Sequence, residues 1–251
     1  EFGLTHRIIE EDGFSIHARV EMLLSGDSPE ATGKSVGLGV IGFADALVRL
    51  APDWVVLLGD RYETFAAAQA ALFARIPIAH IAGGDTTEGS YDEALRHSIT
   101  KMAHLHFVTN EIAAQRVRQL GEDPRRVFNY GSPGIDYIKR LKLLTREQLE
   151  GGLGFRFRQR NLLVTFHPAT LETQPPAEQL AQLLAALGDL EQERTGLIFT
   201  MPNADTGGRA LIRMIDGFVS SRPNARAYAS LGQSRYLSLM SQVDIVVGNS
   251  S

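Results

Sequence analysis

The sequence predicts an α/β protein with two domains, each built on a parallel sheet. Short apolar runs rich in β-branched residues alternate with amphipathic segments, a pattern typical of βαβ units. Because the apolar runs are short and bounded by turn residues, they suit strands buried on both faces of a sheet. The chain has 251 residues, which is enough for one large domain or two modest ones.

The first half contains three strand–helix repeats, preceded by a helix that ends near Leu50. The clearest strand is 54–58, because it contains adjacent valines and is closed by Gly59 and Asp60. The segment after it is rich in Ala and lacks Gly and Pro, which favours a helix. The predicted strands are 54–58, 77–81 and 105–108, and the predicted helices are 62–75, 92–102 and 111–120.

The second half repeats the same alternation. Strands are predicted at 161–166, 196–200, 225–228 and 243–247, with helices at 177–193, 209–221 and 234–241. The stretch between the halves, 139–160, is charged and then glycine-rich, so it has no clear pattern. We therefore predict an N-terminal domain at 1–145 and a C-terminal domain at 146–251.

The composition excludes several classes of protein. With 25 basic and 29 acidic residues the net charge is −4, so no basic surface for nucleic acid or an acidic membrane is expected. The absence of cysteine excludes disulfide frameworks and thiolate metal sites. No uninterrupted apolar run approaches the roughly 18 residues of a membrane span, and a cytoplasmic protein is expected.

A glycine motif at 37–42 matches the G-x-G-x-x-G pattern of dinucleotide sites, and Asp60 follows 18 residues after Gly42. Such a fingerprint follows a strand directly and opens a helix. Here the preceding strand candidate ends near Leu24, and the glycines fall within a predicted helix. We therefore favour close helix packing over dinucleotide binding and predict no cofactor.

Acidic residues gather after two successive predicted strands and at the start of the next helix. They are Asp60, Asp85, Glu88, Asp92 and Glu93. In a parallel sheet, ligands bind beyond the carboxyl ends of the strands, so these residues predict a functional site there. The alternative is that Asp60 and Asp85 cap the helices that follow them. Capping would explain one acid in each loop but not the whole group.

Four histidines lie near this group, namely His80, His97, His104 and His106. His104 and His106 would share one face of a strand, and an H-x-H pair can bind metal. The chain has no H-E-x-x-H motif and no third ligand at a spacing typical of metal sites. We therefore interpret the histidines as structural and predict no metal.

Polar residues also follow three predicted strands of the second half. His167 comes after the first, Asn203 after the second, and Ser250 and Ser251 after the last. Each group could be a simple turn. Their recurrence at three strand ends favours a site for a diphosphate or a nucleoside.

Six motifs recur in order through nearly the whole chain, namely Gly59-Asp60-Arg61-Tyr62-Glu63, His80-Ile81-Ala82-Gly83-Gly84-Asp85, Asp92-Glu93-Ala94-Leu95-Arg96-His97, Phe166-His167-Pro168, Pro202-Asn203-Ala204-Asp205-Thr206 and Gly248-Asn249-Ser250-Ser251. With these motifs the chain resembles the hydrolysing UDP-N-acetylglucosamine 2-epimerases, in the bacterial branch that serves sialic and related nonulosonic acids. The resemblance implies a GT-B-like architecture, in which two Rossmann-like domains face a cleft that holds the nucleotide sugar. It also implies no nicotinamide, no catalytic metal and a homodimer or homotetramer.

The resemblance further implies a reaction and its residues. UDP is eliminated to give 2-acetamidoglucal, and water then adds to give N-acetylmannosamine. The implied catalytic residues are Asp60, Asp92, Glu93 and Asp85. The implied substrate-binding residues are Arg61, Arg96, His97, His167, Asn203, Ser250 and Ser251.

The chain departs from the family in two ways. Ala82 stands where some family members have a catalytic Glu and others a His, so either a neighbouring residue takes over this task or the substrate or the rate differs. The family's first strand with its basic loop and a ribose-binding Glu beyond the last residue are not matched, so we expect a fragment, truncated at both ends and inactive alone. The alternatives are the same reaction on UDP-N,N′-diacetylbacillosamine, a GT-B glycosyltransferase and a nucleotide-sugar sensor without activity.

Overall fold

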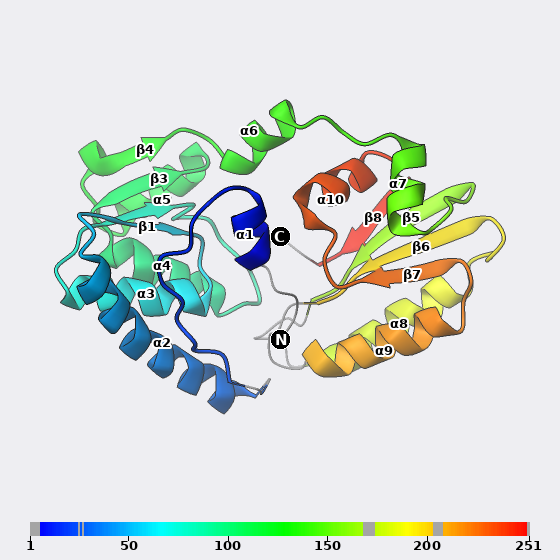
Figure 1. The fold of residues 1–251 in the computed structure, drawn as a ribbon, viewed down its shortest axis with the longest axis horizontal. Coiled ribbons are helices and arrows are strands. Elements are labelled where there is room, and N and C mark those ends of the chain that lie inside the picture. Colours follow the sequence, from blue (N-terminus) through cyan, green and yellow to red (C-terminus); the bar gives the residue numbers. More distant parts are fainter. Residues whose placement is uncertain (1–5, 25, 27, 168–173, 203–207, 250–251) are drawn as a thin grey trace. The chain divides into compact units, whose positions relative to one another are not determined.

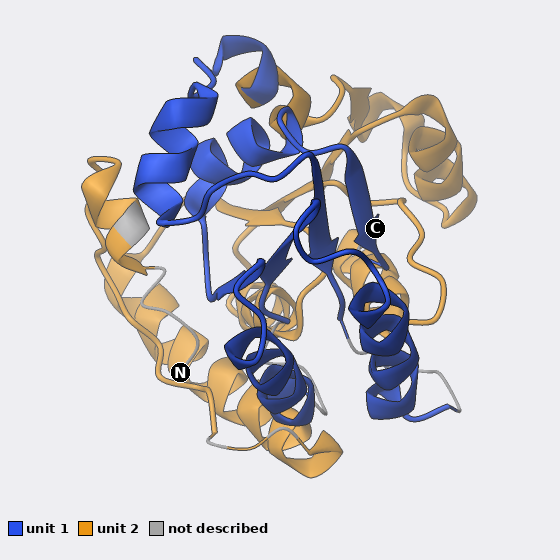
Figure 2. Ribbon diagram, turned by 90° about the vertical axis from the view of Figure 1, so that its right-hand side faces the viewer, with its two compact units in different colours: residues 1–4, 138–251 blue, residues 5–137 orange. Residues whose placement is uncertain are grey.

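The computed structural model describes residues 6–249 except 25, 27, 168–173 and 203–207. The chain forms two compact units, unit 2 at residues 5–137 and unit 1 at residues 138–251 (Figure 2). This division lies at Tyr137, within helix α6 (Pro133–Arg140), whereas the glycine-rich stretch pointed to residue 145. The segment after α6 belongs with unit 1 because Leu149 and Leu153 pack into the core of that unit.

Unit 2 contains a four-stranded parallel sheet in the order β1-β2-β3-β4 (Figure 1). Its elements are α1 (His6–Glu11), α2 (Pro29–Leu50), β1 (Val55–Leu58), α3 (Tyr62–Phe73), β2 (Ile78–Ile81), α4 (Asp92–Met102), β3 (Leu105–Val108), α5 (Glu111–Gln119), the 3-10 helix η1 (Pro124–Arg126) and β4 (Val127–Asn129). The register places Leu57, His80 and His106 side by side across β1, β2 and β3. These three residues therefore share one face of the sheet.

The core of unit 2 lies on that face of the sheet. Leu57 and Ile78 pack with Ile99 of α4 and a row of alanines from α3. Towards β4, Val108 and Val127 pack against α5. On the opposite face of β1, Val56 and Leu58 are more than 60% exposed. Among the described residues, the helical layer thus covers one face of this sheet.

Helix α2 packs along α3 through its small residues. A Cβ on Gly39 would lie 2.7 Å from Met22 Cε and 2.9 Å from Ala66 Cβ, so a side chain there would not fit. A Cβ on Gly42 would lie 2.6 Å from Val20 Cγ1, so a side chain would not fit there either. The G-x-G-x-x-G motif therefore lies inside a helix, and two of its three glycines, Gly39 and Gly42, serve close packing, as the sequence predicted.

By length and composition alone, α2 would also be long and apolar enough to cross a membrane. Charged and polar residues interrupt the apolar residues of α2, so it contains no unbroken apolar run of the length of a membrane span. Core helices of soluble proteins and signal sequences pass the same test, and 22% of the apolar window of α2 is buried, including Gly39, Ala46 and Leu47.

Unit 1 holds a second parallel sheet, in the order β7-β6-β5-β8. Its elements are α7 (Arg146–Leu153), β5 (Arg160–Thr165), α8 (Pro176–Gly188), β6 (Thr195–Thr200), α9 (Gly208–Ser220), β7 (Ala225–Tyr228), α10 (Gly232–Met240) and β8 (Ile245–Gly248). Leu162 and Phe199 face α8 and α9, while Leu163 and Ile198 face α7 and α10. Helices therefore cover both faces of this sheet (Figure 1).

The predicted α/β class with two parallel sheets is confirmed, and the seven strands predicted from residue 54 onward are present within two residues of their predicted bounds. The strand candidate that ends near Leu24 is wrong, because residues 14–24 pair with no strand of the sheet. Strand β4, which has only three residues, and helix α6, which ends where the charged stretch begins, were not predicted from the sequence. The helix predicted at 177–193 ends earlier, at Gly188.

Two glycines of α2 should respond in opposite ways to alanine. Gly39→Ala should lower the free energy of unfolding by about 1–3 kcal/mol, because the new methyl group overlaps Met22 and Ala66. Gly33→Ala should raise it by about 0.5–1 kcal/mol, because a methyl group there meets open space and improves helix propensity. Urea unfolding followed by circular dichroism measures both. Equal effects of the two changes would contradict the packing role of Gly39.

Candidate active site

The guanidinium of Arg96 joins three segments at the carboxyl ends of β1 and β2. Arg96 lies on α4, and its side chain is only 9% exposed. It forms an ion pair with Asp60, which follows β1, and donates to the backbone carbonyl of Asp85 at 2.7 Å. It also donates to Thr87 Oγ1 at 2.9 Å. One buried cation therefore fixes the loop after β1 against the loop after β2.

The loop after β2 can approach this position because of its glycines. Gly84 has φ +84°, and a Cβ there would overlap the carbonyl oxygen of Ala113 on α5. Arg116 of α5 donates to the Gly84 carbonyl and holds the loop from the other side. Ala82 also has a left-handed backbone, with φ +63°, which costs an L-residue roughly 1–2 kcal/mol. The loop is thus held in a conformation that most residues would disfavour.

Glu93 connects to the same network through the backbone of Thr87. The Thr87 N–H donates to Glu93 Oε2 at 3.1 Å, while Glu93 Oε1 lies 3.7 Å from His97 Nε2. Asp92, one residue earlier, accepts from the Ser90 hydroxyl at 2.9 Å. Both carboxylates stand in the first turn of α4, where the helix dipole favours negative charge.

The carboxylate of Asp85 points to the end of β3 rather than towards Arg96. Both of its oxygens accept from Thr109 Oγ1 at 3.0 Å, and Asn110 Nδ2 donates at 3.2 Å. Helix α3 begins after Arg61 and α4 after Tyr91, neither with a side-chain cap. Helix capping therefore does not account for Asp60 and Asp85.

Arg61 stands beside Asp60 at the start of α3. Its Nε lies 3.4 Å from Glu63 Oε2, and its guanidinium lies 5.2 Å from the centre of the Tyr62 ring. About a third of its side chain is exposed. The position is compatible with a cation that meets an anionic ligand.

His80 of β2 supports the loop that contains Asp60. Its Nε2 lies 2.8 Å from the carbonyl oxygen of Gly59, which can only accept, so Nε2 carries the proton. Its Nδ1 lies 3.1 Å from the hydroxyl oxygen of Thr100, and that hydroxyl donates to the backbone carbonyl of Arg96 at 3.0 Å. Burial lowers the pKa of His80 to about 4, although the bond to Gly59 opposes this shift. His80 is therefore neutral near pH 7 and holds the residue before Asp60.

The polar residues of the second half lie in unit 1. The His167 N–H donates to Asn249 Oδ1, and Asn249 Nδ2 donates to the His167 carbonyl, both at 2.8 Å. This reciprocal pair ties the end of β5 to the end of β8. Asn203, Ser250 and Ser251 lie outside the described residues.

No group of three or more His, Asp or Glu side chains within the described part of the chain is placed to hold a metal ion. His106 is buried on β3, where it contacts Glu122 at 3.1 Å, and burial lowers its pKa. His104 Nδ1 accepts from the Ile78 N–H at 3.3 Å. These contacts fit the structural role predicted for the two histidines.

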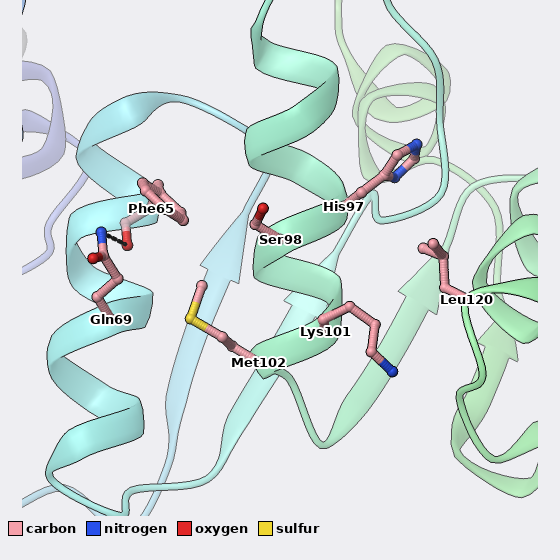
Figure 3. Close-up of a pocket in the computed structure, with 7 residues that line it drawn as sticks. All are labelled: Phe65, Gln69, His97, Ser98, Lys101, Met102 and Leu120. Atoms are coloured by element: carbon pink, nitrogen blue, oxygen red, sulfur yellow. Dashed lines mark hydrogen bonds between the residues drawn. The ribbon is translucent and has the colours of Figure 1, made fainter.

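A pocket of about 420 Å³ lies along α3, α4 and the end of α5, and none of the site carboxylates lines it (Figure 3). It is lined by Phe65, Gln69, His97, Ser98, Lys101, Met102 and Leu120. Of the predicted site residues, only His97 borders this pocket.

Sequence reasoning missed the residues that hold the site residues in place. Thr87, Thr109 and Asn110 follow predicted strands and could have been found by reading every strand end for hydrogen-bond donors. The role of His80 depends on its contact with Gly59, 21 positions away, and no local pattern signals it.

Two parallel sheets flanked by helices, each with polar residues at its carboxyl edge, define a GT-B-like α/β protein. Residues 4–251 match the family model described as UDP-N-acetylglucosamine 2-epimerase. The chain belongs to this family.

The relatives are similar along the whole chain. A Campylobacter jejuni protein named GDP/UDP-N,N′-diacetylbacillosamine 2-epimerase (hydrolyzing) is 39% identical, covering all of this chain and 65% of its own length. Legionella pneumophila UDP-N,N′-diacetylbacillosamine 2-epimerase (hydrolyzing) is 33% identical with the same coverage. Escherichia coli polysialic acid biosynthesis protein P7 is 37% identical over all of this chain and 63% of its own length. The chain therefore spans about 65% of the length of these curated relatives.

Solved structures share the fold at low sequence identity. UDP-GlcNAc 2-epimerase from Neisseria meningitidis, bound to UDP-GlcNAc, has a TM-score of 0.79 at 19% identity, covering 98% of this chain and 67% of that chain. The Methanocaldococcus jannaschii enzyme, in complex with UDP-GlcNAc and UDP, has a TM-score of 0.76 at 16% identity, covering 96% and 66%.

Arg96→Lys should destabilise the protein, because one ammonium group cannot reach Asp60, Asp85 and Thr87 together. We expect the free energy of unfolding to fall by about 2–4 kcal/mol in a urea titration. The control is Arg118→Lys, which changes an exposed ion pair with Glu111 and should cost less than about 0.5 kcal/mol. Similar losses in both variants would refute the structural role of Arg96.

Stability should decrease below pH 6.5 because of His80. In the unfolded chain His80 has a pKa near 6.5, whereas burial lowers the pKa of His80 to about 4 in the folded protein. The free energy of unfolding should therefore fall between these values, by roughly 3 kcal/mol at most. In His80→Gln this decline should become shallower, while above pH 7 the two curves should run parallel. Urea unfolding at a series of pH values measures both slopes, and unchanged slopes would contradict the burial of a neutral His80.

Proposed function

We propose that the protein is a hydrolysing 2-epimerase that converts UDP-N-acetylglucosamine and water into N-acetylmannosamine and UDP. The observation that carries the proposal is the network linking Asp60 and Glu93 through Arg96 and Thr87 in a chain of this family. This network gathers carboxylates at the carboxyl edge of a parallel sheet, where ligands of such folds bind.

The first step needs a base and a stabilised positive charge. The hydrogen at C2 of the sugar is not adjacent to a carbonyl group, so it is hardly acidic. Cleavage of the C1–O bond must therefore run ahead, with its electron pair leaving on UDP. The positive charge that develops at C1 acidifies the C2 hydrogen and is stabilised by nearby carboxylates. One carboxylate takes this proton, and the C1–C2 double bond of 2-acetamidoglucal forms.

The second step adds water across this double bond. The water oxygen bonds to C1 while its proton passes to a carboxylate, and C2 receives a proton from the opposite face of the ring. Together, the two steps invert the configuration at C2 and hydrolyse the bond between C1 and UDP. No electrons are gained or lost overall, so the proposed reaction calls for no redox cofactor.

The site residues divide into two proposed groups. Asp60 and Asp92 are the proposed acid and base, because the first is fixed by Arg96 and the second opens α4. Glu93 and Asp85 are the proposed supporting carboxylates, and His97 a neighbour that orients Glu93. The proposed binding residues for the UDP group are Arg61, His167, Asn203, Ser250 and Ser251. Arg96 is better placed to position Asp60 than to meet substrate directly, because it is buried.

A second candidate substrate is UDP-N,N′-diacetylbacillosamine, which carries the same 2-acetamido group. It is favoured by the names of the relatives that are 39% and 33% identical to this chain. The reaction would be identical at C1 and C2, so the same carboxylates would serve. A cytoplasmic enzyme that works as a homodimer or homotetramer remains our expectation.

Replacing Asp60 or Asp92 by Asn should abolish the reaction. In the complete gene product we expect kcat to fall at least about 100-fold for each, because a general acid or base is lost. The matched control is Asp53→Asn, an exposed carboxylate before β1, which should keep the activity. Release of UDP from each nucleotide sugar measures the rate. Full activity of Asp60→Asn or Asp92→Asn would refute the mechanism.

Solvent deuterium separates this reaction from its alternatives. In D₂O, the 2-epimerase incorporates deuterium at C2 of the free sugar. A glycosyltransferase would release no free sugar without an acceptor, and a sensor would bind without turnover. The preferred substrate is the one with the larger kcat/KM when UDP-N-acetylglucosamine and UDP-N,N′-diacetylbacillosamine are compared.

A further inference from the structure

The carboxylate of Asp85 is held by two neutral donors at the end of β3. Both of its oxygens lie 3.0 Å from Thr109 Oγ1, and Asn110 Nδ2 donates to Oδ1 at 3.2 Å. The backbone carbonyl of Asp85 is fixed as well, because it accepts from Arg96 of α4 at 2.7 Å. Asp85 is therefore held at its main chain from α4 and at its side chain from the start of α5.

Hydrogen-bond chemistry fixes the direction of each donor around Asp85. The Ala113 N–H donates to Asn110 Oδ1 at 2.8 Å, so the nitrogen of the Asn110 amide is the atom that faces Asp85. This nitrogen also donates to Thr109 Oγ1 at 3.1 Å, so its two protons go to Thr109 and Asp85. The Thr109 hydroxyl then directs its one proton to the carboxylate, which only accepts. Hydrogen bonds that run in one direction in this way strengthen one another.

The negative charge of Asp85 is not matched by a cation of the described residues. Asp60 forms an ion pair with Arg96, whereas Asp85 forms none within the part of the chain that the structure describes. Thr109 and Asn110 are neutral, so they hold the Asp85 carboxylate in place without cancelling its charge. A carboxylate held in this way is suited to stabilise a positive charge that develops in a bound ligand, because it needs no reorientation during the reaction.

We propose that Asp85 stabilises the positive charge at C1 of the sugar, and that Thr109 and Asn110 are positioning residues for this role. The inference rests on the proposed function. As the C1–O bond breaks, its electron pair leaves on UDP, and the charge that develops at C1 meets the Asp85 carboxylate. Asp85 takes up no proton in this step, so another carboxylate removes the hydrogen from C2. Because this charge develops only in the transition state, the loss of a positioning residue should lower kcat and leave KM nearly unchanged.

A purely structural role is the alternative, since Asn110 is also the N-cap residue of α5. In that case the loss of Thr109 or Asn110 would lower the stability of the fold and leave the rate of the folded enzyme unchanged. The two roles can be separated by mutation, because Asn110 uses its side-chain oxygen for the helix and its nitrogen for Asp85.

The first experiment measures kcat and KM for UDP release by the complete gene product and its Thr109 variants. Thr109→Val keeps the shape of the side chain and removes the hydroxyl, so kcat should fall roughly tenfold while KM changes less than about twofold. Thr109→Ser keeps a hydroxyl and should recover most of the wild-type kcat. The matched control is Thr145→Val, which removes the N-cap of α7 and should lower the urea midpoint of unfolding without changing kcat.

Asn110→Ser separates the positioning role from helix capping. Serine offers an oxygen to the Ala113 N–H, as asparagine does, but provides no amide nitrogen for Asp85. The urea midpoint should therefore stay unchanged, whereas kcat should fall about threefold to tenfold. The wild-type kcat in Asn110→Ser would contradict the role proposed for Asn110. If Thr109→Val fails to fold, as judged by circular dichroism, Asn110→Ser still decides the question.

A double-mutant cycle tests whether Thr109 acts through Asp85. Asp85→Asn removes the charge that Thr109 orients, so the further change Thr109→Val should lower kcat no more. Losses that multiply would show that Thr109 acts elsewhere and would overturn the proposal. A wild type that releases no UDP would overturn the proposed function and this inference together, whereas an active wild type and an equally active Thr109→Val would overturn the positioning role alone.

Discussion

The arrangement of the site in unit 2 depends on one buried cation, the guanidinium of Arg96. It contacts Asp60 after β1 and both Asp85 and Thr87 after β2, and Thr87 in turn binds Glu93. A buried charge is tolerated only when it is paired and its hydrogen bonds are satisfied. Because the donors of Arg96 point in fixed directions, the two loops have few alternative positions. The fold therefore supplies a prepositioned acidic edge rather than a set of separate loops.

Much of the fold could be predicted from local sequence. Helix α4 was predicted with its observed bounds, since its acidic first turn and the strand after it mark both ends. Strand β4 could not be predicted, because three residues carry too little periodicity to separate a strand from a turn. The division of the chain at Tyr137 depends on which core α7 joins, and this is a long-range property.

The residues of the candidate site could be predicted from the sequence, but the contacts that hold them in place could not. Strand ends and the start of the following helix predict Asp60, Asp85, Asp92 and Glu93 as candidate site residues, because parallel strands bring their carboxyl ends to one edge. They do not reveal that Arg96 is buried against Asp60, or that His80 lies under Gly59. Those contacts join positions 36 and 21 residues apart, and their geometry follows from the sheet register rather than from any local pattern.

The two sheets differ in how their strand order relates to synthesis on the ribosome. In unit 2 each strand pairs with the one before it, so every new strand meets a neighbour that has already emerged. In unit 1, one edge of β5 pairs with β8, which is translated about 80 residues later. Closing so long a loop slows folding and leaves an edge of β5 unpaired meanwhile. Strands β1 to β4 can therefore pair in the order in which they are translated, whereas β5 can pair with β8 only after about 80 further residues have been made.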